Sequence, residues 1–179
     1  GRYATDMRAR STMRAPRVAI VVLNWNGWQD TLACIASLQN VTYTDFRIVL
    51  VDNRSTDESM LHFQREIPSV ELLQAGANLG FGGGCNVGIR HALAQGAEFV
   101  WLINSDATVD PGALSALVQL ADQYPAVGAV GSVLFDAGAV TQIQLWGGGR
   151  VGLWSGRSVH CRAPAAIDFV SGASVLLRA

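Results

Sequence analysis

The chain has 179 residues, of which 50% are apolar, and its 13 basic and 14 acidic side chains give a net charge of −1. These values describe one compact domain that can bury its own core, and they exclude a disordered or collagen-like chain. Cys34, Cys85 and Cys161 lie far apart and form no Cys-x-x-Cys pair. A disulfide framework and a zinc site are therefore not expected, and a reducing compartment is the default.

All 13 basic residues are arginines, and five of them lie in the first 17 residues, which carry a charge of +4. We expect residues 1–17 to be a leader, either disordered or derived from expression, that precedes a core over 18–179. Its positive charge would also allow contact with anionic lipid. The rest of the chain carries −5, which argues against nucleic-acid binding. No apolar run approaches the ~18 residues of a membrane span, so we expect a cytoplasmic protein, with association at the inner membrane face left open.

Short β-branched runs alternate with amphipathic stretches from Arg17 onward, which is typical of a mainly parallel sheet covered by helices. Strands are predicted at 18–23, 46–51, 70–73 and 99–103. The predicted helices follow these strands: one from Trp28, one around 60–63 capped by Ser55 or Thr56, one that ends near Ala94 after a glycine-rich loop at 76–84, and one from Asp110-Pro111 to Tyr124-Pro125.

Beyond Pro125 the pattern changes to strand-like segments at 127–135, 140–146 and 169–177 with glycine-rich turns between them. No further helix is predicted there. The sequence therefore predicts an α/β fold with four βα units and a mixed-sheet extension.

Ligands of open α/β sheets bind at the carboxyl ends of the strands, and polar residues follow four of the predicted strands. Asp52 follows an apolar strand, and its carboxylate can accept a hydrogen bond from the imide N–H of a pyrimidine base. The alternative is that Asp52 caps the next helix. Because Ser55 or Asp57 could fill that role, we interpret Asp52 as a base-reading residue.

The segment from Asn78 to Gly84 resembles a phosphate loop, because four glycines before a helix let backbone N–H groups approach an anion. It departs from the dinucleotide fingerprint at Cys85, which stands in place of the third glycine. A flexible turn is the alternative. Asp106, after the fourth strand, offers one hard oxygen ligand for Mg²⁺ or Mn²⁺, or is a turn residue.

The remaining candidates have structural explanations. His62, His91 and His160 have no neighbour at metal-ligand spacing, so surface or helix roles are favoured. Trp146 and Trp154 beside glycine turns suit sugar stacking, and core packing is the alternative.

Four motifs in chain order resemble the family 2 glycosyltransferases with the GT-A fold, in the branch that includes rhamnosyltransferase-like enzymes. They are Val-Val-Leu-Asn-Trp-Asn-Gly at 21–27, Val-Asp-Asn-Arg-Ser-Thr-Asp at 51–57, Asn-Leu-Gly-Phe-Gly-Gly-Gly-Cys-Asn-Val-Gly at 78–88 and Leu-Ile-Asn-Ser-Asp at 102–106, with a looser fifth match at 169–178. The resemblance covers about residues 18–178.

This resemblance implies a donor site for a UDP- or dTDP-sugar. The residues it implicates are Asn24, Asn26, Asp52, Asn53, Ser55, Asn78, Gly80, Phe81, Asn86 and Asn104. Asp106 matches the last acid of the family's Asp-x-Asp metal motif, whose first acid is Asn104 here, and the implied cofactor is Mg²⁺ or Mn²⁺. Arg90 is a further candidate for the phosphates, from its helical spacing to Asn86.

The implied reaction is an inverting transfer of a sugar, such as rhamnose, to a polysaccharide or lipid-linked acceptor in bacterial cell-wall synthesis. It needs a carboxylate base, which in the family lies downstream of the segment matching 169–178. We therefore expect that the catalytic base and a C-terminal part lie beyond Ala179, and of the acids in the second half only Asp168 is near an acceptor-side strand. Two alternatives remain, a nucleotide-sugar-binding module without turnover and a nucleotidyltransferase, although 24–27 lacks the basic residue that the latter needs.

Overall fold

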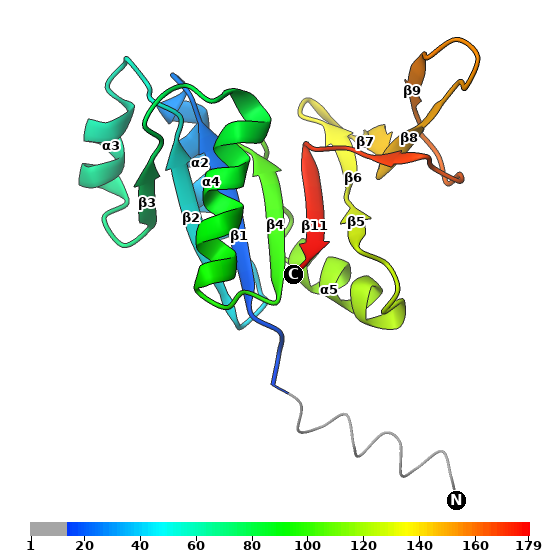
Figure 1. Cartoon of the computed structure of the whole chain (residues 1–179), viewed down its shortest axis with the longest axis horizontal. Coiled ribbons are helices and arrows are strands. Elements are labelled where there is room, and N and C mark those ends of the chain that lie inside the picture. The colour runs from blue at the N-terminus through cyan, green and yellow to red at the C-terminus, as the bar shows by residue number, and fades with distance from the viewer. Residues whose placement is uncertain (1–13) are drawn as a thin grey trace, which may run out of the picture.

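A computed structural model describes residues 14–179 and shows four βα units followed by a β-rich extension (Figure 1). The units are β1 (Val18–Asn24), α2 (Trp28–Leu38), β2 (Phe46–Asp52), α3 (Ser59–Glu66), β3 (Glu71–Gln74), α4 (Gly80–Ala94), β4 (Phe99–Asn104) and α5 (Ala113–Gln123). The extension comprises β5 (Ala129–Gly131), β6 (Val133–Asp136), β7 (Ala139–Trp146), β8 (Gly148–Val151), β9 (Ser158–His160), β10 (Phe169–Val170) and β11 (Ser174–Arg178). The predicted order of the four βα units is confirmed.

The central sheet has six strands in the order β3-β2-β1-β4-β11-β5. The first four run parallel, and β11 runs antiparallel to both β4 and β5. The strand from the end of the chain thus enters the sheet beside β4. This mixed, mainly parallel sheet is the one that the alternation of strands and helices predicts.

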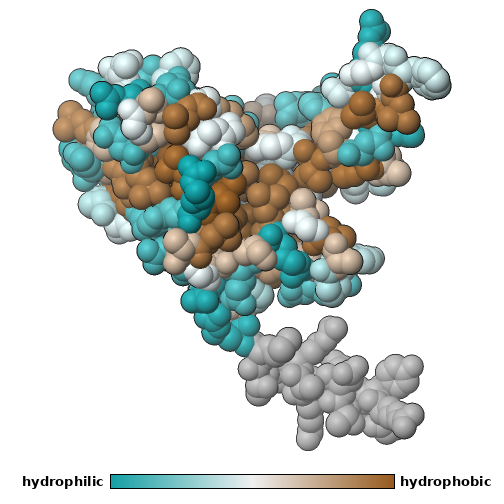
Figure 2. Space-filling view, viewed as in Figure 1, coloured by the Kyte–Doolittle hydropathy of each residue, from teal (hydrophilic) through white to brown (hydrophobic). Residues whose placement is uncertain are grey.

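Two apolar layers flank the sheet. Helices α2, α3 and α5 cover one face, where Ile35, Phe63 and Leu114 are buried against residues such as Ile20 and Trp101. On the opposite face lies α4, and Figure 2 shows apolar surface beside it. No helix in the described part of the chain is long and apolar enough to cross a membrane.

The prediction of a glycine-rich loop over 76–84 is wrong, because α4 already begins at Gly80. Gly84 is buried, and a methyl group there would overlap Leu23 and approach Asn53. A methyl group at Gly88 would overlap Val21 and crowd Val51. These glycines therefore let the helix pack directly on β1 and β2.

The extension holds two strands that the sequence did not predict, β8 and β9. The predicted turn glycines Gly148 and Gly149 are themselves paired, with Val170 and Phe169 of β10. A methyl group at either position would overlap neighbouring backbone. Glycine is needed here for close approach of strands rather than for a turn.

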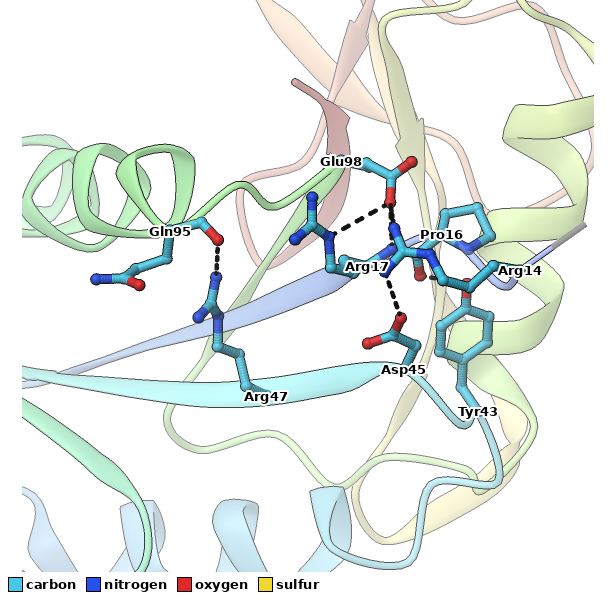
Figure 3. A network of polar contacts seen from close by, with 8 residues as sticks. All are labelled: Arg14, Pro16, Arg17, Tyr43, Asp45, Arg47, Gln95 and Glu98. Carbon is cyan, nitrogen blue, oxygen red and sulfur yellow. Dashed lines mark hydrogen bonds and ion pairs between the residues drawn. The ribbon is translucent and has the colours of Figure 1, made fainter.

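Residues 14–17 of the predicted leader lie against the core, while the rest of the leader falls outside the described residues (Figure 3). Arg14 contacts Asp45 at 3.4 Å and Glu98 at 2.9 Å. Glu98 also accepts a hydrogen bond from the backbone N–H of Arg17 at 2.8 Å. Tyr43 donates to the carbonyl of Pro16. This segment leads directly into β1.

Candidate functional site

The carboxyl ends of β1, β2 and β4 lie side by side at one edge of the sheet, and we call these ends and the loops after them the carboxyl edge. Asn24 is in register with Asp52, and Leu23 is in register with Asn104. Three of the four predicted polar clusters therefore meet through strand pairing alone. The fourth, at Asn78, follows β3 and is tied in by side-chain contacts.

A buried hydrogen-bond network joins the first two clusters. Asn24 donates from Nδ2 to Asp52 Oδ1 and to Ser55 Oγ, each at 3.0 Å, and its Oδ1 accepts from Thr31 at 2.8 Å. Asp52 also accepts from the backbone and hydroxyl of Ser55. Asn24 and Asp52 have no exposed surface. The network holds β1, α2 and the loop after β2 together.

This arrangement corrects the assumption that Asp52 is free. Ser55 does not cap α3, since its hydroxyl bonds to Asp52 and Asn24, and the N-cap residue Glu58 makes no side-chain cap bond. Asp57 instead accepts a hydrogen bond from the backbone of Ser59. The carboxylate of Asp52 thus faces the protein interior, where it holds the loop after β2 through Ser55.

The exposed loops above the network are also tied to each other. Asn26 accepts a hydrogen bond at Oδ1 from the backbone of Thr56 at 2.8 Å, and its own backbone N–H donates to Ser55 Oγ at 3.0 Å. Asn26 and Arg54 both have positive φ, 53° and 63°. Such left-handed backbone is costly outside glycine and is often found at functional sites.

Asn53 connects the carboxyl edge to the start of α4. Its Nδ2 donates to Asn78 Oδ1 at 3.0 Å and to the carbonyl of Gly80, and its Oδ1 accepts from the backbone of Leu79 at 3.0 Å. Asn53 is buried, whereas Asn78, Leu79 and Gly80 are exposed. The polar side chain fixes a turn whose backbone remains open to solvent.

The N-terminus of α4 points toward the carboxyl edge, because the helix follows β3 and returns along the sheet. Its first-turn N–H groups have no partner within the helix, and the helix dipole favours an anion there. Phe81 is half-exposed, and Gly172 of the turn before β11 approaches its ring. Asn104 donates its backbone N–H to Ala173 of the same turn at 2.9 Å. The β10–β11 turn thus borders the edge.

Two predicted donor-site residues are not brought to this edge. Asn86 and Arg90 are exposed on α4, away from its buried positions Gly84 and Gly88. Arg90 also lies about 15 Å along the helix from Gly80 at 1.5 Å per residue. The spacing of one helical turn puts Arg90 on the same side of α4 as Asn86, as predicted. That side is the one that faces away from the sheet.

Asp106 is exposed in the turn after β4, and Asn104 before it is half-buried. Beneath them Cys34 contacts the carbonyl of Asn104 at 3.6 Å. Burial, together with the nearby charge of Asp106, raises the pKa of the Cys34 thiol to about 12. Over residues 14–179 no group of three metal-ligating side chains gathers. Asp106 therefore supplies a single carboxylate, which fits a cation that shares its ligands with a bound diphosphate.

Other acids of the second half have structural roles. Asp168, the base candidate on the acceptor side, accepts a hydrogen bond from the backbone of Val151 at 2.9 Å and so holds β8. Asp110 accepts a hydrogen bond from the backbone of Gly112. The helix α5 begins only at Ala113, later than the start at Asp110-Pro111 that the sequence predicts. Neither carboxylate lies at the carboxyl edge.

The histidines have the surface and helix roles that the sequence favours. His62 on α3 stacks on Trp28 with ring centroids 3.5 Å apart and contacts Glu66. His91 on α4 pairs with Glu71 of β3. A hollow of about 170 Å³ lined by apolar side chains such as Phe63 and Ile67 lies beneath α3, away from the polar network.

Sequence reasoning missed two residues of the edge. Thr31, buried in α2, bridges Asn24 and the carbonyl of Gly27. The available signal was a polar residue on the same helix face as Cys34 and Ile35. Trp25 is 56% exposed between Asn24 and Asn26. A large exposed aromatic inside a polar motif is the signal that could have identified it.

The family model described as "Glycosyl transferase family 2" matches residues 19–158. An N-acetylglucosaminyl-diphospho-decaprenol L-rhamnosyltransferase of Mycobacterium tuberculosis is 36% identical over 114 residues, which are 57% of this chain and 36% of that protein. The galactofuranosyltransferase GlfT1 of the same species is 35% identical over 83 residues, 43% of this chain and 26% of its own length. The chain thus spans about a third or less of these relatives.

Solved structures share the fold. A mannosyltransferase from Pyrobaculum calidifontis in complex with GDP-Man and Mn²⁺ superimposes with a TM-score of 0.61 at 23% identity, over 75% of this chain and 42% of that one. TarS 1–349 from S. aureus in complex with UDP-GlcNAc gives a TM-score of 0.52 at 23% identity, over 61% and 32% of the two chains. The fold is the GT-A fold that the motifs imply.

Proposed function

The chain belongs to glycosyl transferase family 2, and on that premise we propose that it forms the donor-binding part of a transferase that moves a sugar from a UDP- or dTDP-sugar to a lipid-linked or polysaccharide acceptor. The supporting observation is the convergence of Asn24, Asp52, Asn53 and Asp106 at one edge of the sheet. The similarity to the mycobacterial rhamnosyltransferase supports rhamnose as the sugar and a lipid-linked diphosphate as the acceptor.

The donor would contact the exposed groups and be shaped by the buried ones. Asn26 and the loop at Arg54 present open polar groups beside β1 and β2, while Asn24 and Asp52 hold these loops in place. We therefore assign Asp52 an indirect role in base recognition. The two solved neighbours carry GDP and UDP donors, so the preference for a pyrimidine is a property for experiment to decide.

The diphosphate would lie between Asp106 and the start of α4. The backbone N–H groups of Phe81 and Gly82 and the helix dipole would attract its negative charge, while the N–H of Gly80 donates to Asn78. A divalent cation such as Mg²⁺ or Mn²⁺ held by Asp106 would neutralise that charge and stabilise the leaving diphosphate. Asn104 stands where the first acid of the metal motif would be, which leaves the cation fewer charged protein ligands.

Transfer with inversion is a single displacement at the anomeric carbon, in which an acceptor hydroxyl attacks, the diphosphate leaves, and a carboxylate takes the hydroxyl proton. Asp110 and Asp168 are engaged elsewhere. This observation favours a second candidate function for these residues, nucleotide-sugar binding without turnover.

Thermal denaturation with nucleotides tests the proposal. UDP or dTDP with Mn²⁺ is expected to raise Tm, since a ligand at about a hundred times its Kd adds about 2.7 kcal/mol of stability. Asp106→Asn is expected to abolish the metal-dependent part of the shift. Asp122→Asn, an exposed change on α5, is the matched control. Equal shifts with GDP and ADP would contradict pyrimidine recognition, and no shift with any nucleotide would contradict a donor site.

Turnover separates the two candidate functions. The 179-residue chain is incubated with dTDP-rhamnose and a polyprenyl diphospho-sugar, and sugar transfer is measured. Nucleotide binding without sugar transfer supports the binding function. Sugar transfer would contradict it and would place the base within the 179 residues.

A further inference from the structure

The β8–β9 hairpin ends in a closed turn that we call the hairpin tip, residues 152–157. Gly152 donates its backbone N–H to the carbonyl of Arg157, and Gly156 donates to the carbonyl of Gly152, both at 2.8 Å. Gly156 has φ of 65°, which a glycine adopts without strain. The backbone polar groups at the base of the tip are thus paired with each other.

Two large apolar side chains stand at the top of this turn. Leu153 is 94% exposed and Trp154 is 103% exposed. Val159 on β9, at 67%, continues the apolar surface down one strand. Single exposed apolar residues are common, but adjacent leucine and tryptophan with no covering contact mark an interaction surface.

Arginines outnumber acids around the tip, where Asp168 accepts a hydrogen bond from the backbone of Val151 at its base. Between residues 137 and 167 the sequence has three arginines, Arg150, Arg157 and Arg162, and no acidic residue. All three arginines are exposed, and in the described part of the chain none of them forms an ion pair. The rest of the described core is acidic overall, so this positive charge is local to the hairpin.

We propose that the hairpin tip docks on an anionic membrane surface, with Leu153 and Trp154 inserted at the level of the headgroups and Arg150, Arg157 and Arg162 contacting acidic lipids. Tryptophan is favoured at this depth because its ring is apolar and its N–H is polar. Arginines beside it add electrostatic attraction to an anionic leaflet. The occupant is a bilayer because the exposed apolar pair Leu153 and Trp154 stands together with exposed arginines, which matches an apolar layer under an anionic headgroup surface.

The position of the hairpin fits this role. In Figure 1 it rises at the same end of the molecule as the carboxyl ends of the parallel strands, and Figure 2 shows hydrophobic and hydrophilic side chains together over it. A docked hairpin would therefore bring the carboxyl edge toward the bilayer. That orientation suits a lipid-linked acceptor, a consequence that rests on the proposed function, whereas the docking itself does not.

The test is sedimentation of the 179-residue chain with vesicles of equal parts phosphatidylcholine and phosphatidylserine, and with phosphatidylcholine alone. We expect binding to the anionic vesicles that weakens with salt. Leu153→Ser with Trp154→Ser should reduce the partition coefficient at least about tenfold, because both side chains lose their apolar contact with lipid. Leu61→Ser changes an exposed leucine on α3, on the opposite side of the molecule from the hairpin in Figure 1, and is the control that should bind like the unchanged chain.

Two further measurements keep the proposal falsifiable. Vesicles should shift the tryptophan fluorescence of the unchanged chain to shorter wavelength. The Trp154→Phe variant should lose this shift, because position 154 is the one that inserts. Reversal of Arg150, Arg157 and Arg162 to glutamate should abolish anionic selectivity while Tm stays unchanged. Equal binding by the Leu153/Trp154 variant would overturn the proposal, as would concentration-dependent dimers in place of vesicle binding, or a gain in fluorescence with free saccharide alone.

Discussion

Nδ2 of Asn24 lies 3.0 Å from Oδ1 of Asp52, and neither side chain has any exposed surface. The two residues end adjacent parallel strands and are in register. Their contact, together with the bonds from Ser55 and Thr31, converts two polar strand ends into a rigid support for the loops above. Asn24 and Asp52, which mark the site in the sequence, therefore hold the loops in place from beneath.

Asp52→Asn is expected to destabilise the fold by about 3 kcal/mol. The carboxylate accepts from Asn24 and from the backbone and hydroxyl of Ser55, and an amide group would set a donor against one of these donors in a buried place. Chemical denaturation measures the loss. Asp57→Asn, an exposed change in the same loop, is the control. Equal stability of the two variants would contradict the buried network.

Gly88→Ala is expected to cost about 1–3 kcal/mol, because the added methyl group overlaps Val21 and crowds Val51. Gly82→Ala in the same helix has open space around it and should stabilise by up to about 1 kcal/mol through helix propensity. Opposite signs in a urea titration support the packing of α4 on β1. A gain in both variants would mean that α4 sits farther from the sheet.

Glu98→Gln is expected to lower stability at neutral pH and to have little effect in acid. The backbone N–H of Arg17, and then the guanidinium groups of Arg14 and Arg17, hold the pKa of Glu98 below its ordinary value of 4.5. A carboxylate with a lowered folded pKa stabilises the protein above the unfolded value, and this stabilisation is lost as the pH falls through the folded value. Denaturation over a pH series measures it, and a constant difference between the two proteins would contradict it.

Thiol labelling should distinguish the three cysteines. Burial raises the pKa of Cys34 to about 12 and also raises the pKa of Cys85, so little thiolate forms at mildly alkaline pH. Cys161 is only half-buried. Mass spectrometry after a brief exposure to iodoacetamide should therefore find the label on Cys161, and on all three after unfolding. Rapid labelling of Cys34 would show that the end of β4 opens.

Much of the fold was predictable because apolar periodicity reports burial directly, as at Val18–Asn24 and Ala113–Gln123. The errors concern glycine, which has no side chain to report its surroundings. Gly82 to Gly84 look like a loop, yet they are helical, and Gly84 packs directly on Leu23. Gly148 and Gly149 look like a turn, yet they let β10 approach β8.

The candidate site was predictable in position more than in orientation. Parallel strands bring their ends together whatever the side chains do, so Asn24, Asp52 and Asn104 lie at one edge. Which polar groups turn inward depends on competition among neighbours. Ser55 could cap a helix or bond to Asp52, and the choice between them decides whether Asp52 is free. No pattern in the sequence resolves it.

The positive φ of Asn26 and of Arg54 has a consequence for how fast a ligand exchanges. Both residues lie in loops that are already tied together through Ser55 and Thr56. Because the bonds within the chain maintain the unusual backbone, these loops need no closing step when a ligand arrives. Nucleotides should therefore enter and leave this part of the edge at rates set by encounter and surface contacts, without a slow loop movement before either event.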